Sequence, residues 1–315
     1  MNPSKRSFLR RAGHGMALLA AAAAFASPLV NAAKLKVVTT TADFAAIARD
    51  IGGDRIEVAS LAKPTEDSHF VDAKPSLILK LNRADVLIEG GAELEIGWLP
   101  ALMDSTRNPR IHRGSPGNVL ANEGIAMLDV PAVLDRSMGG VHAMGNPHIM
   151  TDPVNARILA EHLARVFSQL DAQSSEFYRA NFQRFSDELD AKLAEWQQRL
   201  APFKGRRIVA YHDSWPYFAR RFGLRIDLFL EPKPGIPPTP PHLAQVIQTM
   251  QQEKINLIFV EPHLNWRTAE TVARQTGATA VLVSQFPGGV KGTEGGYIPL
   301  IEHLVDTVAK NLKAP

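Results

Sequence analysis

The chain has 315 residues, of which 45% are hydrophobic and 21% charged, fractions that are typical of a globular protein with a sizeable core. Residues 1–32 contain four of the 35 basic residues and none of the 32 acidic ones, so without them the formal net charge falls from +3 to about −1, which excludes nucleic-acid binding through a basic surface. The absence of cysteine excludes disulfides, thiolate metal sites and a lipid-modified N-terminal cysteine.

Residues 1–32 are predicted to be a signal peptide. Basic residues between Lys5 and Arg11 precede an apolar run that is too short and too rich in alanine to span a bilayer, and Val30-Asn-Ala32 has the form of a cleavage site. Ser4-Lys-Arg-Ser-Phe-Leu9 is similar to a twin-arginine motif with lysine in the first arginine position. We therefore expect export to the periplasm, by either the general secretory or the twin-arginine route.

Strands alternate with helices in the first half of the remaining chain. Apolar and β-branched runs that end near turn residues predict strands at residues 35–40, 56–61 and 85–88. Residues 43–51 have helical spacing and stop at Gly52-Gly53, and Pro75 is suitably placed to open a second helix that ends at Ala84.

A long helical stretch follows. Residues 155–170 and 174–200 carry apolar side chains at helical spacing, and Pro202 ends the second helix. Twenty-seven residues at 1.5 Å each make a rod of about 40 Å, which exceeds what one small lobe needs and suits a strut that joins two lobes.

The second half repeats the alternation of strands and helices. Strands are predicted at residues 207–211, 225–230, 256–260 and 279–283, each followed by a helix. Strands that alternate with helices imply parallel sheets with right-handed crossovers, so we expect an α/β protein. The predicted boundaries are 33–173 for the first lobe, 174–201 for the linking helix and 202–315 for the second lobe.

Three histidines lie where a ligand site is expected. His69 follows the second strand, His212 directly follows the first strand of the second half, and His148 lies in a turn-rich loop that leads into the long helices. Ligands of open α/β sheets gather outside the carboxyl ends of the strands, and imidazole nitrogen binds zinc and similar ions well. These histidines therefore predict a transition-metal site that the fold must assemble from distant segments.

Five short motifs occur in chain order: Ser68-His-Phe70 with Pro75-Ser76, Gly145-Asn-Pro-His-Ile-Met-Thr-Asp-Pro153, Tyr211-His-Asp-Ser-Trp-Pro-Tyr-Phe218, Glu231-Pro-Lys-Pro-Gly-Ile-Pro-Pro238 and Ile258-Phe-Val-Glu-Pro262. Together they resemble the periplasmic solute-binding proteins of zinc and manganese ABC importers, the high-affinity zinc-uptake binding-protein family, over essentially the whole chain after residue 32. The resemblance implies two lobes, each with a roughly four-stranded parallel sheet flanked by helices, joined by a long rigid helix. It also implies a monomer without enzymatic activity that holds Zn²⁺, or alternatively Mn²⁺, between the lobes. The partners would be an inner-membrane ABC permease and its ATPase.

The sequence departs from the family pattern at two places. Gln285 stands near the position where the family often has a carboxylate, so the fourth ligand is water, Gln285, or a carboxylate from Glu66 or Asp67. The long histidine-rich loop of zinc-specific members is reduced to residues 138–144, which leaves His142 as a surface residue or an auxiliary ligand. Glu261 is predicted to be a buried acceptor that orients a ligand imidazole.

Other classes of protein remain as alternatives. A zinc-dependent hydrolase would also use three protein ligands and a water, but the sequence lacks both H-E-x-x-H and G-x-S-x-G. A binder of organic solutes would be expected to present aromatic cages or arginine clamps instead of the histidine loops. An adhesin role for the same metal-binding fold also stays open.

Overall fold

The computed structural model describes residues 33–133, 139–140 and 142–312, so the predicted signal peptide lies outside the described residues. The first lobe contains a parallel sheet of four strands in the order β2-β1-β3-β4. Its strands and helices are β1 (Leu35–Thr39), α1 (Ala42–Gly52), β2 (Ile56–Ser60), α2 (Pro75–Arg83), β3 (Val86–Glu89), α3 (Leu99–Asp104) and β4 (Asn118–Leu120).

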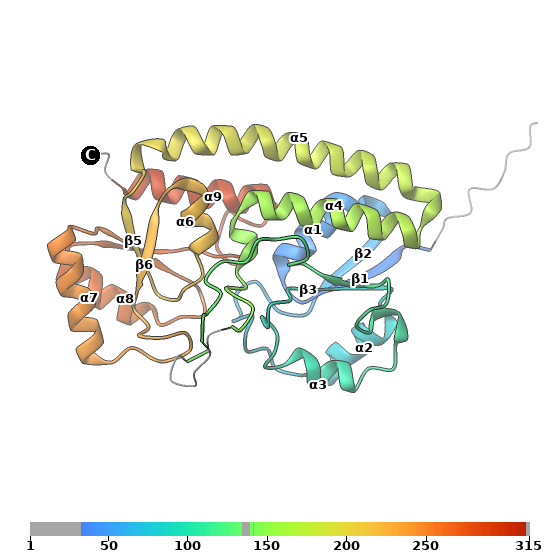
Figure 1. Cartoon of the computed structure of the whole chain (residues 1–315), viewed down its shortest axis with the longest axis horizontal. Coiled ribbons are helices and arrows are strands. Elements are labelled where there is room, and N and C mark those ends of the chain that lie inside the picture. Colours follow the sequence, from blue (N-terminus) through green and yellow to red (C-terminus); the bar gives the residue numbers. More distant parts are fainter. Residues whose placement is uncertain (1–32, 134–138, 141, 313–315) are drawn as a thin grey trace, which may run out of the picture. The chain divides into compact units, whose positions relative to one another are not determined.

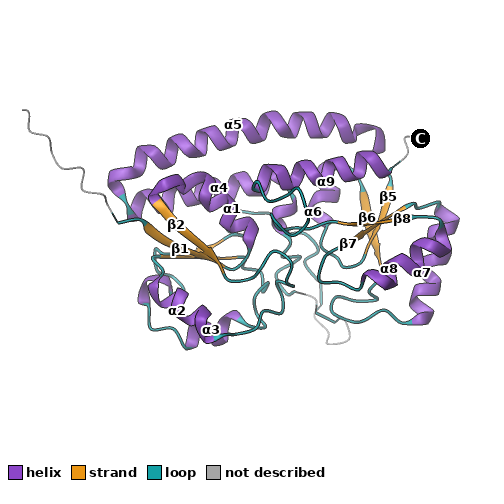
Figure 2. Cartoon of the chain, turned by 180° about the vertical axis from the view of Figure 1, so that it is seen from behind, coloured by secondary structure: helices purple, strands orange, loops and turns teal. Residues whose placement is uncertain are grey.

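Alternating side chains cover the two faces of this sheet. Val37 packs in one apolar cluster with α1 and the long helices, while the adjacent Val38 packs in another with α2 and α3. This is the alternation that a strand buried on both faces requires. Seen from behind, α2 and α3 lie across the first sheet from α4 (Pro153–Leu170) and α5 (Ser175–Leu200) (Figure 2).

The second lobe has the same plan. Its parallel sheet has the order β6-β5-β7-β8. Its elements are β5 (Arg207–Ala210), α6 (Pro216–Phe222), β6 (Arg225–Phe229), α7 (Pro240–Glu253), β7 (Leu257–Val260), α8 (Trp266–Thr276), β8 (Thr279–Leu282) and α9 (Tyr297–Asn311). Short 3₁₀ turns accompany the described elements at Gly53–Arg55, Pro109–Ile111, Ile149–Thr151, Ala172–Ser174 and Ala201–Phe203.

The two lobes share one apolar core. Helix α5 runs along both of them (Figure 1) and packs against α1 and α4 at one end and α9 at the other. Trp196 of α5 is fully buried in the shared cluster, and its indole N–H donates to Glu302 of α9 at 2.9 Å. Because side chains of both sheets belong to this cluster, the lobes are joined by packing as well as by the chain.

The predicted fold class is confirmed, with two four-stranded parallel sheets, flanking helices and a long helix that joins the lobes. Strand β4 and helix α3 were not predicted from the sequence pattern. The lobe boundaries and the removal of residues 1–32 remain predictions. Within the part of the chain that the structure describes, no helix has both the length and the apolar character needed to cross a membrane.

Candidate metal centre

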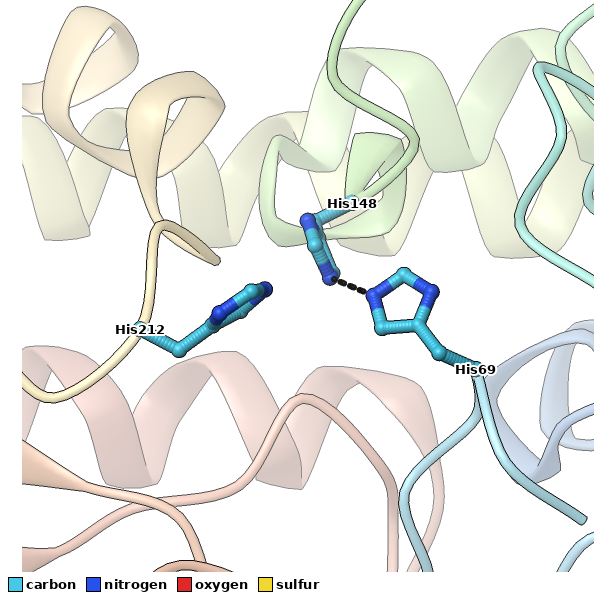
Figure 3. Close-up of side chains that lie close together, drawn as sticks. All are labelled: His69, His148 and His212. Carbon is cyan, nitrogen blue, oxygen red and sulfur yellow. Dashed lines mark hydrogen bonds between the residues drawn. The ribbon is translucent and has the colours of Figure 1, made fainter. Parts of the chain in front are cut away.

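The fold brings His69, His148 and His212 together (Figure 3). His69 comes from the loop after β2, His148 from the segment before α4, and His212 from the second position after β5. One ring nitrogen from each lies within 4.8 Å of the others. The Nε2 atoms of His69 and His148 are 3.2 Å apart, the contact drawn as a dashed line in Figure 3.

In each of the three rings, the Nδ1 atom lies within hydrogen-bonding distance of an oxygen atom. The Nδ1 atom lies 3.2 Å from Leu94 O in His69, 2.8 Å from Asn146 Oδ1 in His148 and 2.8 Å from Glu231 Oε2 in His212. These oxygens accept hydrogen bonds and cannot donate them, so each Nδ1 carries the proton and leaves the lone pair on Nε2.

The orientation of the Asn146 amide is fixed independently. Its Oδ1 also accepts the backbone N–H of His148 at 3.0 Å, and its Nδ2 donates to Asp213 O at 2.8 Å. Asn146 therefore presents its oxygen to the ring, and the tautomer of His148 follows from that.

Lone pairs that face each other repel unless a cation lies between them. In a tetrahedral zinc site with Zn–N bonds of 2.0–2.1 Å, two ligand nitrogens are about 3.3 Å apart. The 3.2 Å separation of the His69 and His148 Nε2 atoms is close to that value. The arrangement therefore fits a metal chelate better than a hydrogen bond between two neutral rings.

The three ligands differ in their affinity for protons. Burial lowers the pKa of His69 to about 4, and it holds the pKa of His148, which is 6% exposed, well below the ordinary value. Burial also acts to lower the pKa of His212, but the hydrogen bond with Glu231 and the charge of Glu261 outweigh it, so the pKa of His212 is raised. His69 and His148 are therefore neutral, with free lone pairs, at physiological pH.

A cavity of about 220 Å³ opens beside the three Nε2 atoms. The auxiliary candidates Asp67, His142 and Gln285 line it. The ring of His142 stacks on that of His69, with 5.1 Å between centroids and 27° between planes. Gln285 is 8% exposed, and its side chain forms no hydrogen bond to another described residue. Asp67 Oδ1 accepts the backbone N–H of His69 at 2.9 Å, so Asp67 supports the loop that carries this ligand.

Glu66 does not reach the site. Its two carboxylate oxygens lie 3.0 Å from Nζ and from the backbone N of Lys63, and Glu66 is not among the residues that line the cavity. His263 lines the cavity, whereas His112, His162, His242 and His303 lie outside it.

The orienting role predicted for Glu261 belongs to Glu231. Glu261 is 1% exposed, and both of its carboxylate oxygens are without a hydrogen-bond partner among the described residues. Strands β6 and β7 flank β5, so a carboxylate follows the neighbouring strand on either side of His212. The sequence places both carboxylates near the ring but does not say to which one the ring bonds. Leu94 was missed as well, because a backbone carbonyl leaves no sequence signal.

Two lobes that share one core and hold converging imidazoles at their junction define a metal-binding solute-binding protein. The chain belongs to the family described as "Zinc-uptake complex component A periplasmic", which matches residues 37–311. The family is one of substrate-binding components of metal ABC importers.

The curated and structural relatives carry different metals in their names. "Iron-binding protein YfeA" of Yersinia pestis is 30% identical over 298 residues, covering 92% of this chain and 90% of the relative. "Manganese ABC transporter substrate-binding lipoprotein PsaA" of Streptococcus mitis is 25% identical over 303 residues, 94% of each chain. The crystal structure of a "138-173 ZnuA deletion mutant plus zinc bound" superposes with a TM-score of 0.74 at 23% identity, covering 90% of this chain and all of that one.

Proposed function

We propose that this protein captures a divalent transition metal ion, preferentially Zn²⁺, in the periplasm and delivers it to an inner-membrane ABC permease and its ATPase. The observation that carries the proposal is the convergence of three imidazoles, each with its Nδ1 against an oxygen acceptor and with one ring nitrogen within 4.8 Å of those of the other two. The ion is cargo in this proposal, held without catalysis by a monomeric protein.

The chemistry of the ligands favours zinc over manganese. The three imidazoles make a nitrogen-rich ligand set with a neutral amide at Gln285 in the same cavity, whereas manganese prefers oxygen ligands. The intrinsic order of divalent affinities also places manganese below zinc, although it places copper above it. Because relatives are named for iron and for manganese, a preference for manganese is the alternative proposal.

Competition between the two ions tests the proposal. We expect the metal-free protein to bind zinc at least about a hundredfold more tightly than manganese, a difference of roughly 2.7 kcal/mol. A Gln285→Glu variant should narrow this margin, because it adds a carboxylate oxygen to the cavity. Equal affinities of the unmodified protein for the two ions would mean that the ligand set is misidentified.

We also propose that residues 1–32 are removed on export, so that the mature chain begins at Ala33. The basic, apolar and small-residue regions of this segment support the proposal. The intact mass of protein from the exported fraction tests it, since a mass that includes residues 1–32 is incompatible with cleavage. A reporter fusion in strains that lack either export system distinguishes the two routes.

A further inference from the structure

His212 follows strand β5, and a glutamate follows each of the two strands that flank β5. The order β6-β5-β7 places Glu231, the second residue after β6, and Glu261, the first residue after β7, on opposite flanks of β5. Parallel strands end at one edge of their sheet, so both carboxylates lie near the ring of His212. The charges of both act on His212, which is consistent with this placement.

The two carboxylates lie in different surroundings. Glu231 belongs to the loop of residues 230–239 between β6 and α7, and Pro234 and Gly235 of this loop line the metal cavity. Glu231 Oε2 accepts from His212 Nδ1 at 2.8 Å and from the backbone N–H of Gly235 at 3.3 Å. Glu231 therefore belongs to a loop whose Gly235, Ile236 and Pro237 are exposed and accessible to a docking partner.

Glu261, in contrast, is deeply buried and lacks a hydrogen-bond partner. Both of its oxygens are enclosed and form no hydrogen bond of standard geometry with a described residue; the hydroxyl of Ser214, which is also unpaired by this measure, lies close enough to act on the Glu261 carboxylate. A buried polar group without a partner is costly and calls for an explanation. The Ser214 hydroxyl and the ring of His212 are the two side-chain donors that act on this carboxylate, and of the two only His212 is a candidate metal ligand.

Release of the ion by wide opening of the lobes is opposed by the shared core. The lobes are also tied by the bonds from Arg221 to Asp152 at 2.7 and 2.9 Å, and from the Tyr297 hydroxyl to Met150 O at 2.7 Å. A local motion that removes one of three ligands leaves these contacts in place. His212 is suited to such a motion because it is the one ligand of the three that follows a strand of the second sheet.

We propose that Glu231 and Glu261 are alternative hydrogen-bond acceptors for His212, and that transfer of the ring from Glu231 to Glu261 withdraws its Nε2 from His69 and His148 and releases the ion. The ring bonded to Glu231 is the metal-binding conformer. Displacement of the 230–239 loop by the importer removes Glu231, and the buried Glu261 then holds the ring. The inference rests on the proposed function, since it describes how the same site releases its cargo.

A double-mutant cycle on zinc affinity distinguishes competing acceptors from cooperating ones. Glu231→Ala should weaken zinc binding by about 10- to 100-fold, the usual effect of losing a group that orients a ligand. Adding Glu261→Met should recover at least about threefold of that loss, because the competing acceptor is gone. If the double variant binds zinc as weakly as Glu231→Ala or more weakly, Glu261 does not compete for the ring and the proposal is overturned.

The Glu261→Met variant should fold, because it replaces an unpaired buried carboxylate by an apolar side chain of similar length. By itself it should slow the loss of zinc to excess chelator, and unchanged or faster loss contradicts the proposal. Glu89→Gln, at a strand end of the first sheet and away from the metal cavity, is the matched control and should leave zinc binding and release unchanged.

Nitrogen-15 NMR of the histidine rings in the metal-free protein tests whether Glu261 accepts a hydrogen bond from His212 when Glu231 is absent. In metal-free Glu231→Ala, a ring N–H of His212 should stay protected from solvent exchange by Glu261, and the protection should disappear in the double variant. Rapid exchange already in Glu231→Ala overturns the proposal. An unmodified protein that binds no zinc would instead contradict the proposed function, and the NMR result would still decide whether Glu261 holds the ring.

Discussion

The three imidazoles reach the metal centre from three separate segments, and each contributes one Nε2 atom. Removing any one leaves two ligands, so we expect His69→Ala, His148→Ala and His212→Ala each to weaken zinc binding at least about tenfold, roughly 1.4 kcal/mol. Alanine at His112, His162 or His303, which lie outside the cavity, should change it little. Calorimetric titration measures these effects, and a loss at His112 equal to that at His212 would contradict the ligand assignment.

The pKa differences among the ligands predict how many protons zinc displaces. His212, with a raised pKa, is largely protonated below the ordinary histidine value of 6.5, whereas His69 stays neutral down to about pH 4, and burial also holds the pKa of His148 well below the ordinary value. Between about pH 5 and 6, zinc should therefore displace about one proton, and its dissociation constant should rise about tenfold per unit fall in pH. Calorimetry in buffers of different ionisation enthalpy counts these protons, and a count near three would contradict the pKa assignments.

The three candidate ligands could be predicted from the sequence, but most of the contacts that orient their rings could not. His69 and His212 follow predicted strands, and ligand sites gather at strand ends. The stacking of His142 on His69 and the bond from His69 to Leu94 O depend on how loops from different strands pack. No local pattern in the sequence encodes such packing, and this is also why the bond of His212 to Glu231 was missed.

At the scale of elements, the ends of the strands and helices predicted with residue ranges agree with the structure to within one or two residues, whereas β4 and α3 were missed. Strand β1 is marked by several consecutive β-branched or apolar residues, whereas β4 has three residues, of which one, Val119, is fully buried. Its pairing with β3 is a long-range contact, and a three-residue run carries too little periodicity to predict a strand.

Helix α4 begins at a residue that also ties it to the second lobe. Asp152 is 1% exposed, accepts from the backbone N–H of Val154 at 2.9 Å as the helix cap, and pairs with Arg221 of α6. Replacing Asp152 by Ala removes the cap and leaves a partly buried guanidinium unpaired, so we expect the free energy of unfolding to fall by about 2–4 kcal/mol.

Denaturant unfolding followed by circular dichroism measures this loss. Asp190→Ala is the matched control, because Asp190 pairs with Arg157 on an exposed surface and such pairs contribute about 0–1 kcal/mol. Equal losses in the two variants would show that the pair between Asp152 and Arg221 adds no more to stability than a surface pair.

For the whole molecule, a core that continues from one lobe to the other predicts that metal binding and folding are coupled. Only the folded chain brings residues 69, 148 and 212 together, so zinc at a hundredfold excess over its dissociation constant should stabilise the fold by about 2.7 kcal/mol. A thermal melt with and without zinc should show a rise in Tm of several degrees that a chelator reverses, and His212→Ala should reduce the rise at the same zinc concentration. Acidification should remove it as well, because protonated imidazole cannot bind the ion. A Tm indifferent to both zinc and chelator would contradict the metal centre itself, since a site assembled by folding cannot bind its ion without stabilising the fold.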